Sequence, residues 1–394
     1  MSVITVVGIG ADGWAGLAEP ARAAVLASDT IVGAQRQLEL LPNGGATKRA
    51  WPSPIGPLVD ELVDGIDGSV CVLASGDPML HGIGATLARR VGPGRLVVHP
   101  HPSAFALACA RLGWPEAEVE LISAVARPAE VVVPLLQPGQ RVVAYGDAAL
   151  LARVLRERGF GPSRFVVLEQ LGGPHERITE ATADGWRDAD ADPDPDPLHA
   201  VAFECAASPD ALVLQRHPGL PDAAYDHDGQ LTKWPVRAVT LAALRPAPGE
   251  LLWDVGAGSG SIAIEWLRAE PRARAIAIER RADRADRIRA NALRLGVPAL
   301  EVIEGAAPEM LSGLERPDAV FVGGGAGTPG LLDACRQVAG RVVANAVTLE
   351  GERALDAARR RHGGTLMRIE LSHAEPLGGF EAWRPQLPVV QWSA

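Results

Sequence analysis

Short, uninterrupted apolar runs alternate along this chain with stretches in which apolar residues recur at helical spacing. Continuous apolar runs are typical of strands that are buried on both faces of a sheet. We expect strands at residues 3–7, 31–32, 70–74, 96–99, 141–145, 164–168, 198–204, 251–255, 273–278, 302–303, 318–322 and 342–346. We expect helices at 20–27, 56–63, 104–112, 262–268 and 290–295. This alternation predicts an α/β fold, with a doubly wound parallel sheet in the C-terminal part.

The most informative stretch is LLWDVGAGSGSIAIEW, residues 251–266. A buried strand there runs into three glycines at alternate positions, and a helix follows them. Glycines permit a tight turn and let a ligand lie against the backbone. The next strand ends at Glu279, whose carboxylate can accept two hydrogen bonds from a ribose diol. The pattern therefore predicts a nucleoside site at the carboxyl ends of these strands.

The spacing of the glycines distinguishes between two nucleoside cofactors. A dinucleotide fingerprint requires G-x-G-x-x-G, whereas this loop reads G-x-G-x-G, with Ser261 at the place of the third glycine. With Asp254 preceding the loop, the stretch resembles motif I of the Rossmann-like S-adenosylmethionine methyltransferases. A nicotinamide enzyme and a glycine turn without a ligand are the alternatives.

Two further glycine turns follow strands in the N-terminal part. GIGADG, residues 8–13, does fit G-x-G-x-x-G, but Pro20 indicates that the next helix begins only near residue 21, so we expect an open loop that lines a cleft. SGDPMLHGIG, residues 75–84, leaves backbone amides free at the start of a helix. The turn HPSAF, at 101–105, precedes another helix.

These three motifs, in this order and spacing, resemble the tetrapyrrole methylase fold. The resemblance implies two α/β halves, the second at about residues 119–205, that hold S-adenosylmethionine between them. It also implies that the cofactor is not laid on a Rossmann loop. The positions that match the family's cofactor contacts are Gly76, Asp77, Gly82 and Ser103.

The rest of the chain, GLPD…TK…VRA…WDVGAGSGSIAIEW…GAAPE…GG, resembles the decarboxylating methyltransferase domain of the cobalamin pathway. The implied cofactor contacts there are Thr232, Gly256, Ala257, Gly258, Ser259, Gly260, Glu279 and Ala307. The acidic stretch 188–197 is predicted to be a surface loop, because the first domain needs the apolar run after it to complete its sheet. We therefore predict two domains, at residues 1–206 and 207–394.

The joining of the two domains resembles the precorrin-6Y C5,15-methyltransferase (decarboxylating) family. This resemblance implies two S-adenosylmethionine sites, methylation of a reduced precorrin-6 macrocycle at meso carbons 5 and 15, and loss of the ring C acetate carboxylate to give precorrin-8. Lys233, Arg237 and the arginines at 280–294 are candidate partners of the substrate carboxylates, although a solvated helix face also explains that arginine series. No catalytic side chain is assigned.

Composition restricts the alternatives. The net charge of −10 argues against a general nucleic-acid binder. The four cysteines are widely spaced, which predicts neither a metal site nor disulfides. The N-terminus enters a strand with no leader-like segment. We therefore expect a cytoplasmic protein without a membrane span. We also expect a homo-oligomer. A methyltransferase for RNA or another small molecule remains the runner-up, and it would need a basic surface or an aromatic acceptor motif where GGGAG stands. A nucleotide-sensing module is the third reading, and it predicts one site without turnover.

Overall fold

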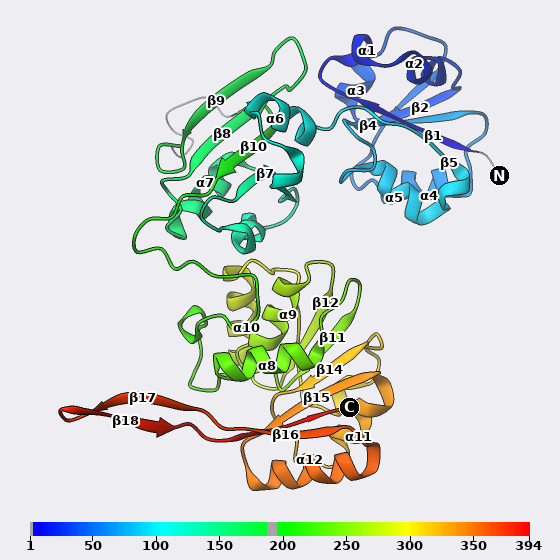
Figure 1. Cartoon of the computed structure of the whole chain (residues 1–394). Coiled ribbons are helices and arrows are strands. Elements are labelled where there is room, and N and C mark those ends of the chain that lie inside the picture. Colours follow the sequence, from blue (N-terminus) through cyan, green and yellow to red (C-terminus); the bar gives the residue numbers. More distant parts are fainter. Residues whose placement is uncertain (1–2, 187–194) are drawn as a thin grey trace. The chain divides into compact units, whose positions relative to one another are not determined.

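The computed structural model describes residues 3–186 and 195–394, and it divides into two compact units. Unit 1 comprises residues 1–127 and 138–211, and unit 2 comprises 128–137 and 212–394. The predicted boundary after residue 206 stays a prediction. Most of the acidic stretch at 188–197, which we predicted to be a surface loop, lies outside the described residues. Figure 1 shows the chain coloured from its N-terminus to its C-terminus.

The first sheet of unit 1 is entirely parallel, and helices cover both faces of its apolar central strands, whereas the edge strand β3 is polar and mostly exposed. Leu58, Val59 and Leu87 of α4 and α5 pack on one face, while Ala21 and Val25 of α2 pack on the other. Its strands, in the spatial order β3-β2-β4-β1-β5, are β1 (Ile4–Ile9), β2 (Thr30–Gly33), β3 (Thr47–Ala50), β4 (Val70–Ser75) and β5 (Leu96–His99). Its helices are α1 (Gly13–Gly16), α2 (Glu19–Leu26), α3 (Gln35–Glu39), α4 (Gly56–Asp64) and α5 (Ile83–Val91).

The second sheet of unit 1 is mixed, with only β6 and β7 parallel. Its order is β6-β7-β10-β8-β9. The strands are β6 (Val119–Ser123), β7 (Arg141–Tyr145), β8 (Arg164–Glu169), β9 (Arg177–Thr182) and β10 (His199–Glu204), and the helices are α6 (Ala104–Leu112) and α7 (Ala148–Glu157). Ala108 of α6 packs on this sheet beside Val143 and Val166.

Unit 2 contains one seven-stranded sheet in the order β13-β12-β11-β14-β15-β19-β16. The first five strands are parallel, and β19 runs antiparallel to both of its neighbours. The strands are β11 (Leu251–Val255), β12 (Arg274–Glu279), β13 (Glu301–Glu304), β14 (Ala319–Val322), β15 (Arg341–Ala346), β16 (Thr365–Ile369) and β19 (Val389–Ser393). The helices are α8 (Trp234–Leu244), α9 (Ser261–Ala269), α10 (Ala282–Arg294), α11 (Leu331–Val338) and α12 (Leu349–His362).

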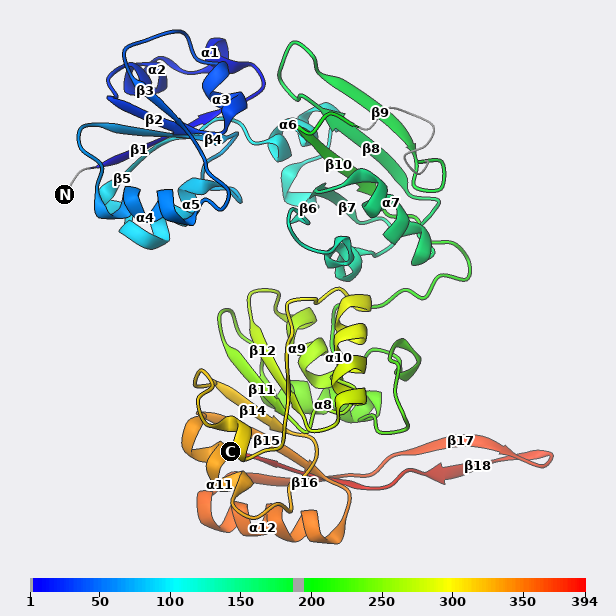
Figure 2. The ribbon, with the colours of Figure 1, turned by 180° about the vertical axis from the view of Figure 1, so that it is seen from behind.

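Two hydrophobic clusters fix the helices to the two faces of this sheet. Helices α8, α9 and α10 cover one face, where Leu241, Ile264 and Ile288 are buried. Helices α11 and α12 cover the other, where Leu332 and Leu355 are buried. Figure 2, which views the chain from the side opposite to Figure 1, shows α9 and α10 beside β11 and β12. The predicted α/β class with a doubly wound C-terminal sheet is thus confirmed.

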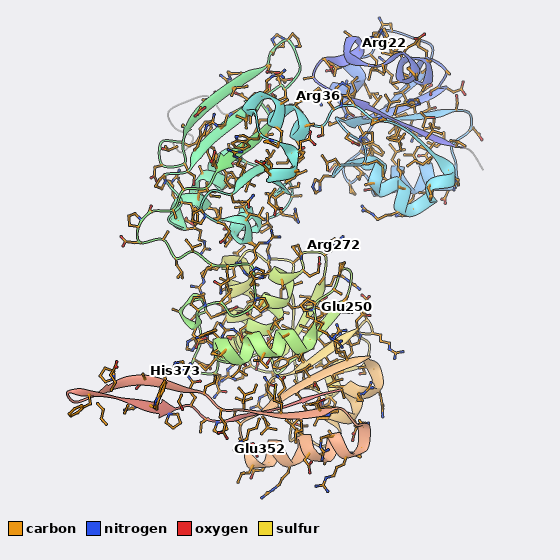
Figure 3. The ribbon with its side chains drawn as sticks, in the orientation of Figure 1. Arg22, Arg36, Glu250, Arg272, Glu352 and His373 are labelled. Atoms are coloured by element: carbon orange, nitrogen blue, oxygen red, sulfur yellow. The ribbon has the colours of Figure 1, made fainter. Side chains whose placement is uncertain are left out.

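A two-stranded arm extends from unit 2. Strands β17 (Ser372–Leu377) and β18 (Phe380–Pro385) pair only with each other. Figure 1 shows them projecting from the body of their unit, and Figure 3 labels His373 on β17. Phe380 and Trp383 on this arm are 82% and 75% exposed. The arm was not predicted from the sequence.

Three expectations about the elements are corrected. Strand β1 continues to Ile9, so Gly8 pairs with Ala74 inside the sheet and does not begin the loop. A one-turn helix, α1, begins at Gly13, and the next helix begins at Glu19. Helix α10 begins eight residues before the predicted 290–295 segment, because its N-terminal half is a polar arginine-rich stretch in which only Ala285 and Ile288 are buried.

Candidate functional site

The main cavity of unit 2 lies at the carboxyl ends of β11, β12, β14 and β15 and has a volume of 730 Å³. This volume is within the range of ligand pockets in proteins, about 300–1,000 Å³. Of the predicted cofactor contacts, all but Gly260 line it. Those lining residues are Thr232, Gly256, Ala257, Gly258, Ser259, Glu279 and Ala307.

The glycine loop after β11 needs glycine for two different physical reasons. Gly256 has a φ of +68°, and a Cβ added there would lie 2.9 Å from the carbonyl oxygen of Gly324 in the loop after β14. Gly260 has a φ of +76°, and a Cβ added there would lie 2.7 Å from Cγ2 of Ile288 on α10. Gly256 therefore allows two loops to meet beneath the cavity, whereas Gly260 allows α9 and α10 to pack.

Glu279 is held at the end of β12 by backbone amides. Gly258 N–H donates to its Oε2 at 2.9 Å, and Arg281 N–H donates to its Oε1 at 3.1 Å. Each carboxylate oxygen keeps a further lone pair, so both can still accept a hydrogen bond from a ligand diol. The glycine loop and the acid that we predicted to bind one nucleoside are therefore held together in one arrangement.

Asp254 lies beneath this loop and does not reach the cavity lining. It is 1% exposed, and its Oδ2 accepts a hydrogen bond from Ala263 N–H at 3.1 Å, while its Oδ1 has no hydrogen-bond partner among residues 3–186 and 195–394. The pKa of this carboxyl rises from 3.8 to about 7, chiefly because the group is buried; the Ala263 amide opposes the rise and the charge of Glu279 adds to it.

The prediction that Arg237 binds substrate carboxylates is wrong. Its side chain is fully buried, with Nε donating to Glu265 at 2.7 Å and Nη1 donating to Asp222 at 2.9 Å. A buried guanidinium needs such partners to offset its lost hydration. Lys233 does line the cavity and lies 3.5 Å from a carboxylate oxygen of Asp222.

The arginines at 280–294 are mostly paired on the surface of α10. Arg281 pairs with Asp283 and Arg289 with Asp286, which fits the reading of a solvated helix face. Arg280 and Arg284 are the two members of the series that line the cavity. Arg284 donates to Asp228, so Arg280 remains as an exposed cation without an ion pair in the described part of the chain.

The other end of the cavity lies over β14 and β15. Gly323, Gly324 and Gly325 follow β14 without side chains that would fill the space, and Asn345 lines the cavity from the end of β15. The wall there comes from the base of the β17–β18 arm, which the sequence reading missed. Its members are Ile369, Leu371, Gln386, Leu387 and Val389.

Unit 1 has a second cavity, of 450 Å³, which all four predicted N-terminal contacts line. Gly76 has a φ of +57°. Asp77 accepts Met79 N–H at 2.8 Å, and Ser103 caps α6 by accepting Ala106 N–H at 3.0 Å. Gly82 precedes α5, where an added Cβ would lie 2.6 Å from the carbonyl oxygen of Pro78. These residues also have structural roles, so their contact with a cofactor stays a prediction.

Other polar side chains in this cavity were not predicted as ligands. Tyr145 accepts Phe105 N–H at 3.0 Å, and burial raises the pKa of its hydroxyl to about 12, so the hydroxyl keeps a proton to donate. His81 packs edge-on to Tyr145 with ring centres 6.3 Å apart and has a φ of +55°. Arg36, labelled in Figure 3, also lines the cavity, and burial lowers its pKa. His101 instead pairs with Asp12 at 3.1 Å, which is a structural role.

The sequence signals for these residues were weak. Tyr145 ends an apolar strand, as Glu279 does, and this is the one signal that could have identified it. Residues 3–186 and 195–394 contain no cluster of three metal-ligating side chains. No helix in the same ranges is long and apolar enough to cross a membrane.

Comparisons with known proteins match both segments of the chain that contain these cavities. A family model described as "Tetrapyrrole (Corrin/Porphyrin) Methylases" matches residues 3–185, and one described as "Precorrin methyltransferase domain" matches 223–394. The "Precorrin-6Y C(5,15)-methyltransferase [decarboxylating]" of Sinorhizobium sp is 45% identical to this chain, and the match covers 99% of this chain and 95% of that protein. A Mycobacterium tuberculosis (strain CDC 1551 / Oshkosh) protein of the same name is 47% identical, with 99% of each chain covered.

Among solved structures, the "C-terminal domain of precorrin-6Y C5,15-methyltransferase from Rhodobacter capsulatus" is 48% identical, with a TM-score of 0.43, and the match covers 46% of this chain and 98% of that one. These two relatives, matched over nearly their full length, confirm the family resemblance that the sequence motifs indicated. They also show that this chain is a methyltransferase. The chain belongs to the precorrin-6Y C(5,15)-methyltransferase (decarboxylating) family.

Proposed function

We propose that this chain methylates a reduced precorrin-6 macrocycle at meso carbons 5 and 15 with S-adenosylmethionine and removes the carboxylate of the ring C acetate, giving precorrin-8 in cobalamin biosynthesis. The observation that carries the proposal is the pair of cavities, one in each family-matched segment and each beside a glycine turn at the end of a buried strand. Two methylations require two transfers, and two cofactor sites on one chain provide for them.

The cofactor supplies a methyl group on a positively charged sulfur, and the protein's task is to align that group with the acceptor in a dry pocket. In unit 2, Glu279 holds the ribose hydroxyls, and the loop at 256–260 follows the methionine part. Thr232 and Ala307 complete this site. In unit 1, the cofactor lies against Gly76, Asp77, Gly82 and Ser103.

The C-terminal domain carries out the decarboxylation in this proposal, because its cavity extends beyond the cofactor loop to Gly323–Gly325 and Asn345. The domains at 1–206 and 207–394 fold separately, and each adds one methyl group. Mass spectrometry of the products formed by the two fragments from precorrin-6Y tests this division. Release of carbon dioxide by fragment 1–206 alone would overturn it.

The chain is also proposed to act as a homo-oligomer in the cytoplasm. The exposed aromatic side chains of the β17–β18 arm support an oligomer, because an isolated hairpin gains little stability by itself in water. Four buried free cysteines suit a reducing compartment. Sedimentation of the wild type and of the double variant Phe380→Ser/Trp383→Ser tests the first point, and an unchanged mass would contradict it.

Calorimetric titration with S-adenosylhomocysteine tests the two sites. We expect two equivalents per wild-type chain, and one in the Glu279→Ala variant, because each charge-assisted hydrogen bond to the ribose is worth about 1.5–3 kcal/mol. Glu304→Ala is the matched control, since Glu304 ends the next strand directly opposite Glu279 and is exposed. One equivalent in the wild type, or two in Glu279→Ala, would contradict the assignment.

A further inference from the structure

Three buried polar side chains form a cluster at the acceptor end of the C-terminal cavity. Asn345 Nδ2 donates to Thr240 Oγ1 at 3.0 Å, and Gln391 Nε2 donates to the same oxygen at 3.0 Å and to Asn345 Oδ1 at 3.0 Å. Asn345 and Gln391 stand directly opposite each other on the antiparallel strands β15 and β19. Thr240 lies on α8, which packs against β15.

Counting donors and acceptors fixes the orientation of the Asn345 amide. The single hydroxyl proton of Thr240 is donated to Val236 O at 2.7 Å, so Thr240 Oγ1 can only accept from the two amides. Both N–H groups of Gln391 are used. Rotating the Asn345 amide by 180° would place an oxygen against Thr240 and a nitrogen against the Gln391 donor, and both contacts would be repulsive.

One N–H group of Asn345 has no partner among the residues that the structure describes. Thr240 is fully buried and Gln391 is 2% exposed, and neither lines the cavity. Asn345 is 8% exposed and does line it. A buried donor without a partner is costly, so this N–H is suited to a ligand in the cavity.

The position of Asn345 excludes the ribose as that ligand. Glu279 ends β12 and Asn345 is near the end of β15, three strands away in the sheet order, which corresponds to about 14 Å at the usual strand spacing. The bare glycines 323–325 lie between them, over the end of β14. The space over these glycines, beyond the cofactor loop, is where the proposed function requires the methyl acceptor.

We propose that Asn345 donates its remaining N–H to the acetate carboxylate that leaves the acceptor as carbon dioxide, with Thr240 and Gln391 as positioning residues. The inference rests on the proposed function. In the reaction, the bond between the methylene and carboxyl carbons breaks, carbon dioxide leaves, and the electron pair passes through the macrocycle before the methylene carbon takes a proton from water and becomes a methyl group.

A neutral donor suits this step better than a cation does. Negative charge moves from the carboxylate into the ring as the bond breaks, so a cation on the carboxylate would stabilise the ground state more than the transition state. A neutral amide can orient the carboxylate while stabilising its ground state less than a cation would. Arg237, the arginine closest to Thr240 in the sequence, is buried against Glu265 and does not line the cavity.

The test is the ratio of carbon dioxide released to methyl groups transferred from S-adenosylmethionine to precorrin-6Y by the full chain. Asn345→Ala should lower this ratio roughly 10- to 100-fold, because a carboxylate that is no longer held in the reactive orientation reacts more slowly. The methylated product that retains its carboxylate should accumulate. Asn345→Asp keeps the shape of the side chain, and it should lower the ratio at least as far, because its charge repels the leaving carboxylate.

Gln391→Met is the matched control. It breaks the same cluster and should lower the unfolding temperature as Asn345→Ala does, but it leaves the Asn345 side chain bonded to Thr240. Its ratio should fall less than that of Asn345→Ala, because the amide donor remains in place but has lost the partner that holds its oxygen. An unchanged ratio in both Asn345 variants, an equal loss of both activities in them, or an equal change in Gln391→Met would overturn the inference. A wild-type chain without either activity would instead contradict the proposed function.

Discussion

The buried carboxyl of Asp254 predicts that the stability of unit 2 depends on pH. The group is 1% exposed, and one of its oxygens has no hydrogen-bond partner in the part of the chain that the structure describes. Burial is the main reason that its pKa rises from 3.8 to about 7, with the charge of Glu279 adding to the rise. Ionisation is therefore more costly in the folded chain than in the unfolded one.

The sign follows from the direction of this shift. Between about pH 4 and pH 7 the folded chain binds more protons than the unfolded chain, so the free energy of unfolding falls as the pH rises through this window and levels off above it. A rise from 3.8 to about 7 corresponds to about 4 kcal/mol at 1.36 kcal/mol per pKa unit. About 2–3 kcal/mol of this falls between pH 5 and pH 8.

The Asp254→Asn variant removes the charge and keeps an oxygen for the Ala263 amide. Differential scanning calorimetry of the full chain at pH 5 and pH 8 measures this effect. From pH 5 to pH 8, the unfolding temperature of unit 2 should fall roughly 5–10 °C more in the wild type than in the variant. Glu304→Gln, a change at an exposed strand end, is the control and should behave as the wild type. Equal pH dependence in the wild type and Asp254→Asn would refute the reasoning.

Three further predictions follow from individual contacts. Arg237→Met leaves Glu265 buried without its cation and should cost about 3–5 kcal/mol in chemical unfolding, part of which Arg237→Met/Glu265→Met should restore. Gly256→Ala places a Cβ 2.9 Å from a backbone oxygen and should abolish one equivalent of S-adenosylhomocysteine binding, whereas Gly313→Ala, at a φ of +92° with open space around it, should not. Tyr145→Phe should weaken binding in unit 1 alone, and loss of the unit 2 equivalent would contradict this.

The buried parallel strands could be predicted from the sequence because helices cover both of their faces, whereas the exposed β3 and the half-buried β6 were missed. Every residue of β11 is buried, so the apolar run at 251–255 coincides with the strand. The predicted bounds of β7 at 141–145, whose three central residues are buried, and of the half-buried β5 at 96–99 are also those observed. A strand buried on both faces leaves an unbroken apolar run, and a single sequence is sufficient to detect it.

Exposed elements gave no comparable signal. All residues of β17 and five of six in β9 are exposed, so neither strand has an apolar face with a period of two residues. Helix α10 is rich in arginine and aspartate, and its buried side is only Ala285, Ile288, Asn291 and Ala292. Such a narrow apolar stripe led us to predict only the end of this helix.

In the candidate site, too, only some of the residues could be predicted from the sequence. The glycine loop and Glu279 could be predicted because a local turn and the end of the next strand bring them together, 21 residues apart at Gly258. The Asn345 cluster could not, because its hydrogen bonds join residues 105 and 151 positions apart. They exist only because β19 enters the sheet antiparallel between β15 and β16, in the register that sets Gln391 opposite Asn345. A shift by one residue would turn Gln391 to the other face of the sheet and leave Asn345 free to rotate. The same strands carry the β17–β18 arm, whose base lines the acceptor end of the cavity, so the register that orients the amide also sets the wall beside it.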